Sequence, residues 1–551
     1  MPHTSTADTP NRRPTRRPVR SSILATSVAA LALAASLVGC SGSASSTAPS
    51  PAADAPGASA ATGADGGFGP AVTAEAITED THYDDDDLTW DAADEVNVRL
   101  ADGENSTAAA GVSVDGNTVT IAAAGTYRLS GELSDGQLVV AAGEEDVVRV
   151  ILDGVNLTSS TGSPFVVSTA NEVLVYLEEG STNTLTDAAT YADTADDAPN
   201  AALYSKADLT IAGSGALTVK GNAYDGIVSK DGLVLAAGNV TVTAADDGIK
   251  GKDYLVLAGG RYNVTAGGDG VKATNDEEAD RGWSSIYGGE LAVAAGDDGV
   301  KAETLLTVHA GTVRVTESVE GLEARHITIN GGTVDLTASD DGVNAAGGSS
   351  DSSGTGIAEG AGNDMPVQPP GGMEPGGTGG MGQGEEAAGD FSLTITGGAL
   401  TVNAEGDGLD SNGDAVITGG TVVVHGPTNN GNGALDVNGT LTIEGGTVTA
   451  AGSAGMAQAP SESSAQSGVQ ISFNSAVSAG TLIQVADADG TVVASFVPAK
   501  KTASLIYSAP EIRAGDTYTV YTGGKEGSLS GATKVSSATA GDYEQGLGPG
   551  F

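Results

Sequence analysis

Short stretches of alternating apolar and polar residues recur along the chain from about residue 205 to residue 450. Each repeat contains a short alternating strand, a Gly-rich turn, a second alternating strand and a turn in which an acidic residue precedes glycine, as in LVLAAGNVTVTAADDGIK and LVLAGGRYNVTAGGDGVK. Alternation with a period of two residues is typical of strands with one buried face, and no helical period separates these strands. The pattern therefore predicts an all-β chain.

The acid-Gly turn sets the period of the repeat. Successive turn glycines are 22, 22, 29, 22, 21 and 66 residues apart, at Gly226, Gly248, Gly270, Gly299, Gly321, Gly342 and Gly408. This period is shorter than a propeller blade of about 40 residues and far longer than the turns of a nonapeptide calcium-binding roll. It favours a right-handed parallel β-helix, a solenoid whose coils stack and bury Val, Leu and Ile in one core. We expect its glycines to serve turns with positive φ.

Changes in composition divide the rest of the chain. Several arginines precede an uncharged Ala/Leu/Val run, which is typical of a secretory signal, and the run ends in a Leu-Val-Gly-Cys sequence that resembles the lipobox of bacterial lipoproteins. We therefore expect lipidation of Cys40; a plain signal peptide or an anchor helix with an incidental cysteine is the alternative. The predicted segments are a lipoprotein signal peptide (1–39), a flexible tether and lead-in (40–95), the β-helix (96–450) with a disordered insertion (347–390), a linker (451–468) and a small C-terminal β segment with its tail (469–551).

The charge of the chain limits its partners. The sequence has 24 Lys and Arg against 71 Asp and Glu, a formal net charge of −47. Such a surface repels nucleic acid and anionic lipid, so we expect no nucleic-acid partner and contact with the membrane only through the lipid anchor, at the extracellular face of the cell membrane. The single cysteine excludes an intramolecular disulfide and a Cys-based zinc site.

The acids of the acid-Gly turns are predicted to stack. Equivalent carboxylates on neighbouring coils would lie about 4.8 Å apart, where two unit charges repel by about 3–4 kcal/mol at an effective dielectric constant near 20. Calcium is one means of neutralising them, because it accepts six to eight oxygen ligands in loose geometry. The candidate calcium ligands are Asp246, Asp247, Asp269, Asp297, Asp298 and Asp341.

Two interpretations without a metal remain open for the same turns. A lysine follows the acid by three residues in several repeats, at Lys250, Lys272 and Lys301, and these lysines could neutralise the row as part of the scaffold. An Asp-Gly turn is also common for local reasons, because Asp bonds its own backbone and Gly accepts unusual φ angles.

Several segments together resemble a known family. The segments GTYRLSGELSDGQLVV, VVRVILDGVNLTS, PNAALYSKADLTIAGSGALTV, ADDGIKGKDYL and GGDGVKATND resemble the bacterial carbohydrate-binding domain family of secreted parallel β-helix proteins. The resemblance implies binding of cellulose-like and acidic, pectin-type polysaccharides, calcium sites at the acid-Gly turns, and a fold similar to that of parallel β-helix pectate lyases. The chain departs from the pattern at Glu320 and Glu323, where neighbouring repeats have Asp and Lys, and near Gly433, where the acid is lost.

The functional prediction is a lipid-anchored polysaccharide-binding protein that uses calcium and performs no chemistry. The candidate carbohydrate-binding residues are Lys250, Lys272, Lys301, Tyr254, Trp283 and Tyr287, although tyrosines in short strands are often packing residues. One alternative is a calcium-dependent polysaccharide lyase, in which Asp269 and Asp298 hold the ion and Lys272, with a lowered pKa, removes a proton. A structural cell-surface spacer or adhesin is the other.

Overall fold

The computed structural model describes residues 77–78, 80–105, 111–347 and 388–544. The predicted signal segment, Cys40, the predicted tether as far as residue 76 and most of the predicted insertion lie outside this part. The described residues are built mainly of strands, with two short 3-10 helices, η1 (Asp85–Leu88) and η2 (Ala92–Asp94). No helix among them is long and apolar enough to cross a membrane. The prediction of an all-β chain is confirmed.

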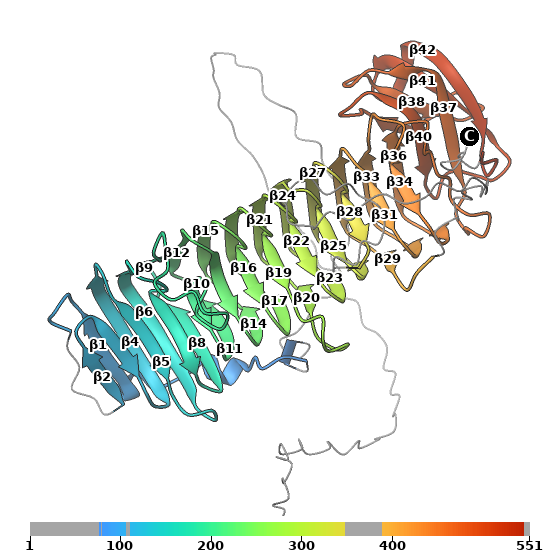
Figure 1. The fold of residues 1–551 in the computed structure, drawn as a ribbon. Coiled ribbons are helices and arrows are strands. Elements are labelled where there is room, and N and C mark those ends of the chain that lie inside the picture. Colours follow the sequence, from blue (N-terminus) through green and yellow to red (C-terminus); the bar gives the residue numbers. More distant parts are fainter. Residues whose placement is uncertain (1–76, 79, 106–110, 348–387, 545–551) are drawn as a thin grey trace, which may run out of the picture. The chain divides into compact units, whose positions relative to one another are not determined.

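Each repeat contributes three short strands, and each strand pairs in parallel with its equivalent in the next repeat (Figure 1). This pairing produces three ladders. The first ladder contains β8 (Glu172–Leu177), β11 (Asp208–Gly213), β14 (Gly232–Leu235), β17 (Tyr254–Leu257), β20 (Trp283–Ile286), β23 (Leu305–Val308), β26 (His326–Ile329), β29 (Ser392–Ile395), β32 (Asp414–Ile417) and β35 (Leu441–Ile443).

The other two ladders follow the same plan. The second ladder contains β9 (Thr182–Thr186), β12 (Ala216–Gly221), β15 (Asn239–Ala244), β18 (Arg261–Ala266), β21 (Glu290–Ala295), β24 (Thr312–Glu317), β27 (Thr333–Ala338), β30 (Ala399–Ala404), β33 (Thr421–His425) and β36 (Thr447–Gly452). The third ladder contains β7 (Phe165–Thr169), β10 (Ala201–Ser205), β13 (Asp225–Ser229), β16 (Ile249–Gly251), β19 (Val271–Ala273), β22 (Val300–Ala302), β25 (Leu322–Ala324), β28 (Val343–Ala345), β31 (Leu409–Ser411) and β34 (Leu435–Val437).

Further strands continue the ladders at their N-terminal end. The N-terminal strands are β1 (Glu95–Leu100), β2 (Val112–Asp115), β3 (Thr118–Ile121), β4 (Gly125–Leu133), β5 (Gln137–Ala141) and β6 (Val147–Thr158). β6 pairs with β8 through its first half and with β9 through its second half, so one long strand starts two ladders.

The C-terminal strands pair in antiparallel fashion. They are β37 (Gly468–Val477), β38 (Ile483–Ala486), β39 (Val492–Phe496), β40 (Thr502–Ser508), β41 (Thr517–Lys525) and β42 (Ser528–Thr539). β40 pairs with β36, the last strand of the second ladder, and with β37. The pairing gives the exposed edge of β36 a partner, which protects a ladder end from joining another chain.

The ladders continue across the insertion. β26 pairs with β29 and β27 pairs with β30, in register, although residues 347–390 separate the two repeats in the sequence. The repeat after the insertion therefore stacks directly on the repeat before it.

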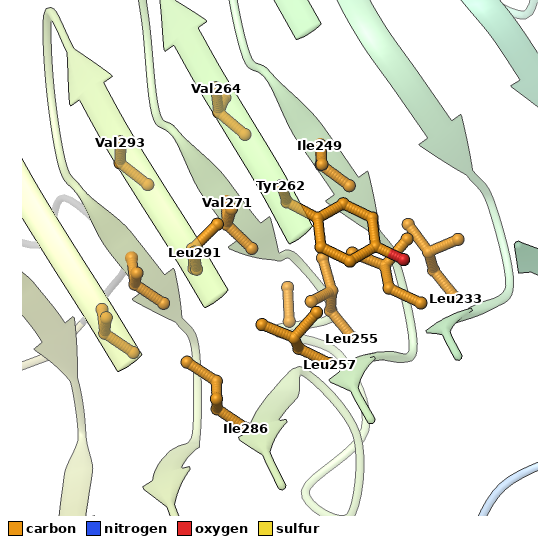
Figure 2. Packing of buried hydrophobic residues seen from close by; sticks show 14 of the residues in the cluster. Leu233, Ile249, Leu255, Leu257, Tyr262, Val264, Val271, Ile286, Leu291 and Val293 are labelled. Atoms are coloured by element: carbon orange, nitrogen blue, oxygen red, sulfur yellow. The ribbon is translucent and has the colours of Figure 1, made fainter. Parts of the chain in front are cut away.

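One apolar cluster runs through the repeats and receives side chains from all three ladders. Figure 2 shows it near Tyr262 of β18, whose ring lies among Ile249 of the third ladder and Leu255 and Leu257 of the first. The Tyr262 side chain is fully buried, and its hydroxyl donates a hydrogen bond to the carbonyl of Ala237 at 2.8 Å. A phenol can be buried here because its one polar group has a partner.

Glycine has two different roles in each repeat. The expected positive φ occurs at the turn between the first and second ladders, for example at Gly260 with φ 86°. The acid-Gly turn needs glycine for another reason: a Cβ on Gly270 would lie 2.3 Å from the Cγ1 of Val293 and 2.6 Å from the carbonyl oxygen of Gly299. The explanation by positive φ is therefore wrong for the acid-Gly turns, where close approach of the next repeat excludes a side chain.

Replacing Gly270 with alanine should lower the free energy of unfolding by about 1–3 kcal/mol, the usual cost of inserting a methyl group into a packed site. Urea unfolding measures the change. Gly162→Ala is the matched control, because the nearest atom to its added Cβ would be 3.7 Å away. Equal stability of the two variants would contradict the steric argument.

Candidate functional site

Two columns of polar side chains run along the third ladder. The acid column contains the residues that precede the turn glycines, Asp225, Asp247, Asp269, Asp298, Glu320, Asp341 and Asp407. The central residues of the short strands form a second column, which we call the variable column; in register, these are Lys250, Lys272, Lys301, Glu323, Asn344, Asp410 and Asp436. The charge of the variable column changes from positive to negative along the chain.

The acid column is tied to the backbone of the following repeat. The Oδ1 of Asp225 accepts a hydrogen bond from the N–H of Asp247 at 3.1 Å, Asp247 accepts from Asp269 at 2.9 Å, and Asp269 accepts from Asp298 at 3.0 Å. Asp341 accepts from the N–H of Asp407 at 2.5 Å in the same way. One oxygen of each of these carboxylates therefore has a structural role.

Lysines take the other oxygens in the first half of the column. The Nζ of Lys250 lies 2.8 Å from the Oδ2 of Asp225 and 2.8 Å from the Oδ2 of Asp247. Lys272 pairs with Asp269 at 2.5 Å. Burial opposes charge on these ammonium groups, but the paired carboxylates outweigh it and raise the pKa of both Lys250 and Lys272.

Lys301 continues this arrangement by one repeat. Its Nζ lies 2.8 Å from the Oδ2 of Asp298 and also pairs with Glu323, the residue that stands where neighbouring repeats have lysine. The three lysine side chains retain only 16%, 23% and 14% of their exposure. They neutralise buried acids and have few free donors for a sugar.

The predicted metal ligands belong to three groups of carboxylates in this first half, the third of which joins Asp298 to Glu320 and Glu323. Asp246 and Asp247 lie with Asp225, and Asp297 and Asp298 lie with Asp269; in each group the carboxylate oxygens are within 4.8 Å of one another. Asp246 and Asp297 are exposed, whereas Asp247, Asp269 and Asp298 are buried and paired with lysine. A cation among the buried acids would compete with an ammonium group already bound there.

The sixth predicted ligand, Asp341, lies where the lysines end. Asp341, Asp407, Asp410 and Asp436 are half-buried, and among the described residues none of them forms an ion pair with Lys or Arg. Burial, with the other acids nearby, raises the pKa of Asp407 to about 7 and that of Asp410 to about 8. Burial also raises the pKa of Asp341 to about 6. We call these four residues the unpaired acid cluster.

Asn344 borders the unpaired acid cluster in the variable column. Its side chain is buried, with 8% exposure, and its Nδ2 donates a hydrogen bond to the Oε2 of Glu320 at 2.9 Å. Its Oδ1 is buried without a hydrogen-bond partner, and Asp410 is its neighbour in register on the next strand. A buried carbonyl oxygen without a partner, next in register to the carboxylate of Asp410, is an oxygen ligand of the kind that calcium accepts.

Sequence reasoning missed Asp410 and Asp436. The available signal was the short third-ladder strand, which reads Ile-Lys-Gly or Val-Lys-Ala in the first repeats and Leu-Asp-Ser or Leu-Asp-Val in the last. Aligning these strands by their apolar first residue places the acids where the lysines stand.

The predicted sugar-stacking aromatics lie on the first ladder and pack against protein. Tyr254 has 3% exposure and its ring stacks on Trp283 at a centroid distance of 5.0 Å. Tyr287 stacks on His309 at 4.5 Å. Tyr254 is therefore a packing residue, as the alternative interpretation held, while Trp283 and Tyr287 remain partly exposed.

A lead-in segment, residues 77–78 and 80–94, covers this aromatic row of Tyr254, Trp283 and Tyr287. Ile77 and Tyr83 are buried with Tyr254 in one small apolar cluster. The backbone N–H of His82 donates to the Oη of Tyr254 at 2.9 Å, and the Nδ1 of His82 lies 3.2 Å from the Oδ1 of Asp208. The first ladder is thus closed to a ligand at the position of Tyr254.

Three comparisons relate parts of this chain to known proteins. Residues 115–364 match the model of a family described as carbohydrate-binding domain-containing protein. A carbohydrate-binding domain-containing protein of Acetivibrio thermocellus is 39% identical over 155 residues, which are 27% of this chain and 54% of that relative, so the chain spans about half the length of the curated relative. A solved structure, the gadolinium derivative of a polysaccharide lyase-like protein from C. thermocellum, is 32% identical, with 44% of this chain and 93% of that chain covered and a TM-score of 0.38. The first and central repeats of the chain thus match a carbohydrate-binding domain family.

Proposed function

We propose that this protein binds polysaccharide at the extracellular face of a bacterial cell membrane, to which a lipid on Cys40 anchors it. The observation that carries the binding function is the match of residues 115–364 to a carbohydrate-binding domain family. The signal segment and the lipobox-like sequence before Cys40 support the location.

We also propose that the three ladders close into a right-handed parallel β-helix. Successive strands visit the third, first and second ladders in a fixed order, and one apolar cluster receives side chains from all three. Crossover connections between parallel strands are right-handed in nearly all proteins, which supports the hand. A crystal structure with the opposite hand would contradict this proposal.

Calcium is proposed to bind at the unpaired acid cluster, with Asp341, Asp407, Asp410, Asp436 and the Oδ1 of Asn344 as the residues that would hold it. The lysine-paired acids earlier in the column are already neutralised, so they favour scaffolding over metal binding. When bound, the ion supplies positive charge on a strongly acidic protein, which an acidic glycan needs in order to approach.

A binding function is favoured over polysaccharide lyase activity by the state of Lys272. A lysine that acts as a general base at neutral pH needs a lowered pKa. Its ion pair with Asp269 raises the pKa of Lys272 instead. As long as Asp269 pairs with Lys272 and not with an ion, this arrangement supports a binding function.

Sedimentation with insoluble cellulose and gel mobility in polygalacturonate, each with calcium or with EDTA, test the function. We expect binding of at least one glycan, loss of polygalacturonate binding in EDTA, and the same loss in Asp407→Asn/Asp410→Asn. The control Asp246→Asn/Asp297→Asn removes two exposed acids beside the lysines and should bind normally. Absence of all binding would favour the spacer, and release of an unsaturated product that absorbs ultraviolet light would favour the lyase.

A further inference from the structure

The outward face of the second ladder contains a shallow groove that the functional proposal above does not use. The groove has a volume of about 220 Å³ and lies over β24, β27 and β30. Its polar lining residues are Arg314, Thr316, Asp335, Thr337, Thr401 and Asn403.

These side chains form rows across the three strands. Arg314, Asp335 and Thr401 are in register on successive strands, and Thr337 is in register with Asn403. Neighbouring parallel strands are about 4.8 Å apart, so the groove offers hydrogen-bonding groups at a regular spacing along a flat surface. A ligand with polar groups repeated along its length suits such a surface.

Several polar groups in the groove have no partner among the described residues. Neither Arg314 nor Asp335 forms an ion pair there, although the two are adjacent in register. The Oδ1 of Asn403 is buried and accepts no hydrogen bond. A buried acceptor without a partner costs stability, and a rotation of the Asn403 side chain toward the groove would let a ligand hydroxyl recover that cost.

The C-terminal strands limit the groove at one end. His425, the neighbour of Asn403 in register on β33, stacks on Phe496 at a centroid distance of 5.3 Å. The N–H of Ala499 donates to the Nδ1 of His425 at 3.2 Å, and Lys500 donates to the carbonyl of Ala404. On the other side the outward residues of β15 and β18, including Asn263, are exposed. The C-terminal strands thus bound the polar outward face of the second ladder at the side of β33, and this face remains exposed at the side of β18.

We propose that this groove is a subsite for a neutral sugar unit of a linear polysaccharide, bound through its hydroxyl groups and without calcium. Sugar hydroxyls both donate and accept hydrogen bonds, and the groove offers the Arg314 guanidinium as a donor, Asp335 and the Asn403 Oδ1 as acceptors, and threonine hydroxyls that do both. The charges of Arg314 and Asp335 balance, so the groove carries no net charge that would favour a uronate over a neutral sugar. The inference rests on the proposed polysaccharide-binding function and names a site and a sugar class for it.

The groove also differs in kind from the aromatic surface that the sequence suggested. It contains no aromatic side chain, so hydrogen bonds and not ring stacking account for recognition. Its position on the second ladder separates it from Trp283 and Tyr287 at the first. Variants in the groove therefore leave the aromatic surface intact.

Calorimetric titration with cellohexaose, a soluble neutral chain, in EDTA tests the subsite. We expect the wild-type protein to bind, and Arg314→Ala and Asn403→Leu each to weaken binding at least tenfold. Asn403→Leu removes the unpaired acceptor at similar volume, so its melting temperature should equal or exceed that of the wild type while its affinity falls. The matched control is Asn263→Ala, which occupies the same outward row on β18, two strands before Arg314, and should stay within twofold of wild type.

The outcomes separate this inference from the proposed function. Unchanged cellohexaose affinity in both groove variants, or binding of polygalacturonate by a wild-type protein that ignores cellohexaose, would overturn the groove and leave polysaccharide binding standing. Loss of cellohexaose binding in EDTA that calcium restores would also overturn it, because the groove needs no metal. Failure of the wild type to bind any glycan would overturn the proposed function and the groove with it.

Discussion

Replacing Lys250 with methionine should lower the free energy of unfolding by about 3–5 kcal/mol, the usual cost of removing one partner from a buried ion pair. Lys250 is the only ammonium that bridges Asp225 and Asp247 among the described residues, at 2.8 Å from each. The Asp225 side chain is fully buried, so water cannot replace the lost charge. Urea unfolding at pH 7 measures the loss, which should shrink as the pH falls and the carboxylates become protonated.

Two further variants make this result specific. Lys250→Met combined with Asp225→Asn should recover part of the loss, because it removes one of the two uncompensated charges. Lys252→Met, two residues away, breaks an exposed pair with Glu277 at 3.5 Å and should cost less than about 1 kcal/mol. If Lys250→Met were no more harmful than Lys252→Met, the lysines would be surface charges and the scaffold interpretation would fail.

In the absence of calcium, the melting temperature should fall as the pH rises from 5 to 8. Burial raises the pKa of Asp341 to about 6, that of Asp407 to about 7 and that of Asp410 to about 8, whereas an aspartate in an unfolded chain has a pKa of about 3.9. Between the two values the folded state holds more protons than the unfolded state, so stability decreases with increasing pH. Burial of Glu320, with a pKa of about 8, acts in the same direction.

Calcium should reverse this trend, because it competes with protons for the same carboxylates. A millimolar excess at pH 8 should raise the melting temperature, and the same addition at pH 5 should do much less. In Asp407→Asn/Asp410→Asn both the pH dependence and the response to calcium should diminish. A wild-type melting temperature that rises steadily from pH 5 to pH 8 in EDTA, or that ignores calcium at pH 8, would contradict the assignment of the unpaired acid cluster.

The sequence predicted the first two ladders because their signal is periodic, but it did not predict the short strands after the acid-Gly turns, which form the third ladder. A turn glycine about every 22 residues and alternating Val, Leu and Ile require strands that stack in parallel, and Gly270 and its equivalents do lie in one row. Which acids are neutralised was not predictable from the turns alone. The acid column repeats nearly unchanged. Whether an acid is neutralised depends on the residue three positions later, which is a lysine such as Lys250 in the first repeats and Asp410 or Asp436 in the last.

Features that depend on contacts distant in sequence were harder to predict. Tyr254 is of a residue type that stacks on sugars, but His82, which lies 172 residues earlier in the sequence, covers it. The groove near Asn403 depends on Arg314 and Asp335, which adjoin it only because the ladder continues across the insertion. Neither arrangement follows from a local pattern of residues.

If the proposed lipid on Cys40 anchors the chain, the covered aromatic row is where mechanical load would enter the protein. The lead-in segment docks at Val234, Tyr254 and Val256, within β14 and β17, and not beside β1 where the ladders begin. A chain tethered through Cys40 would thus be pulled at its flank. Force from a bound polymer would then reach the ladders through the lead-in contacts and not through an end strand.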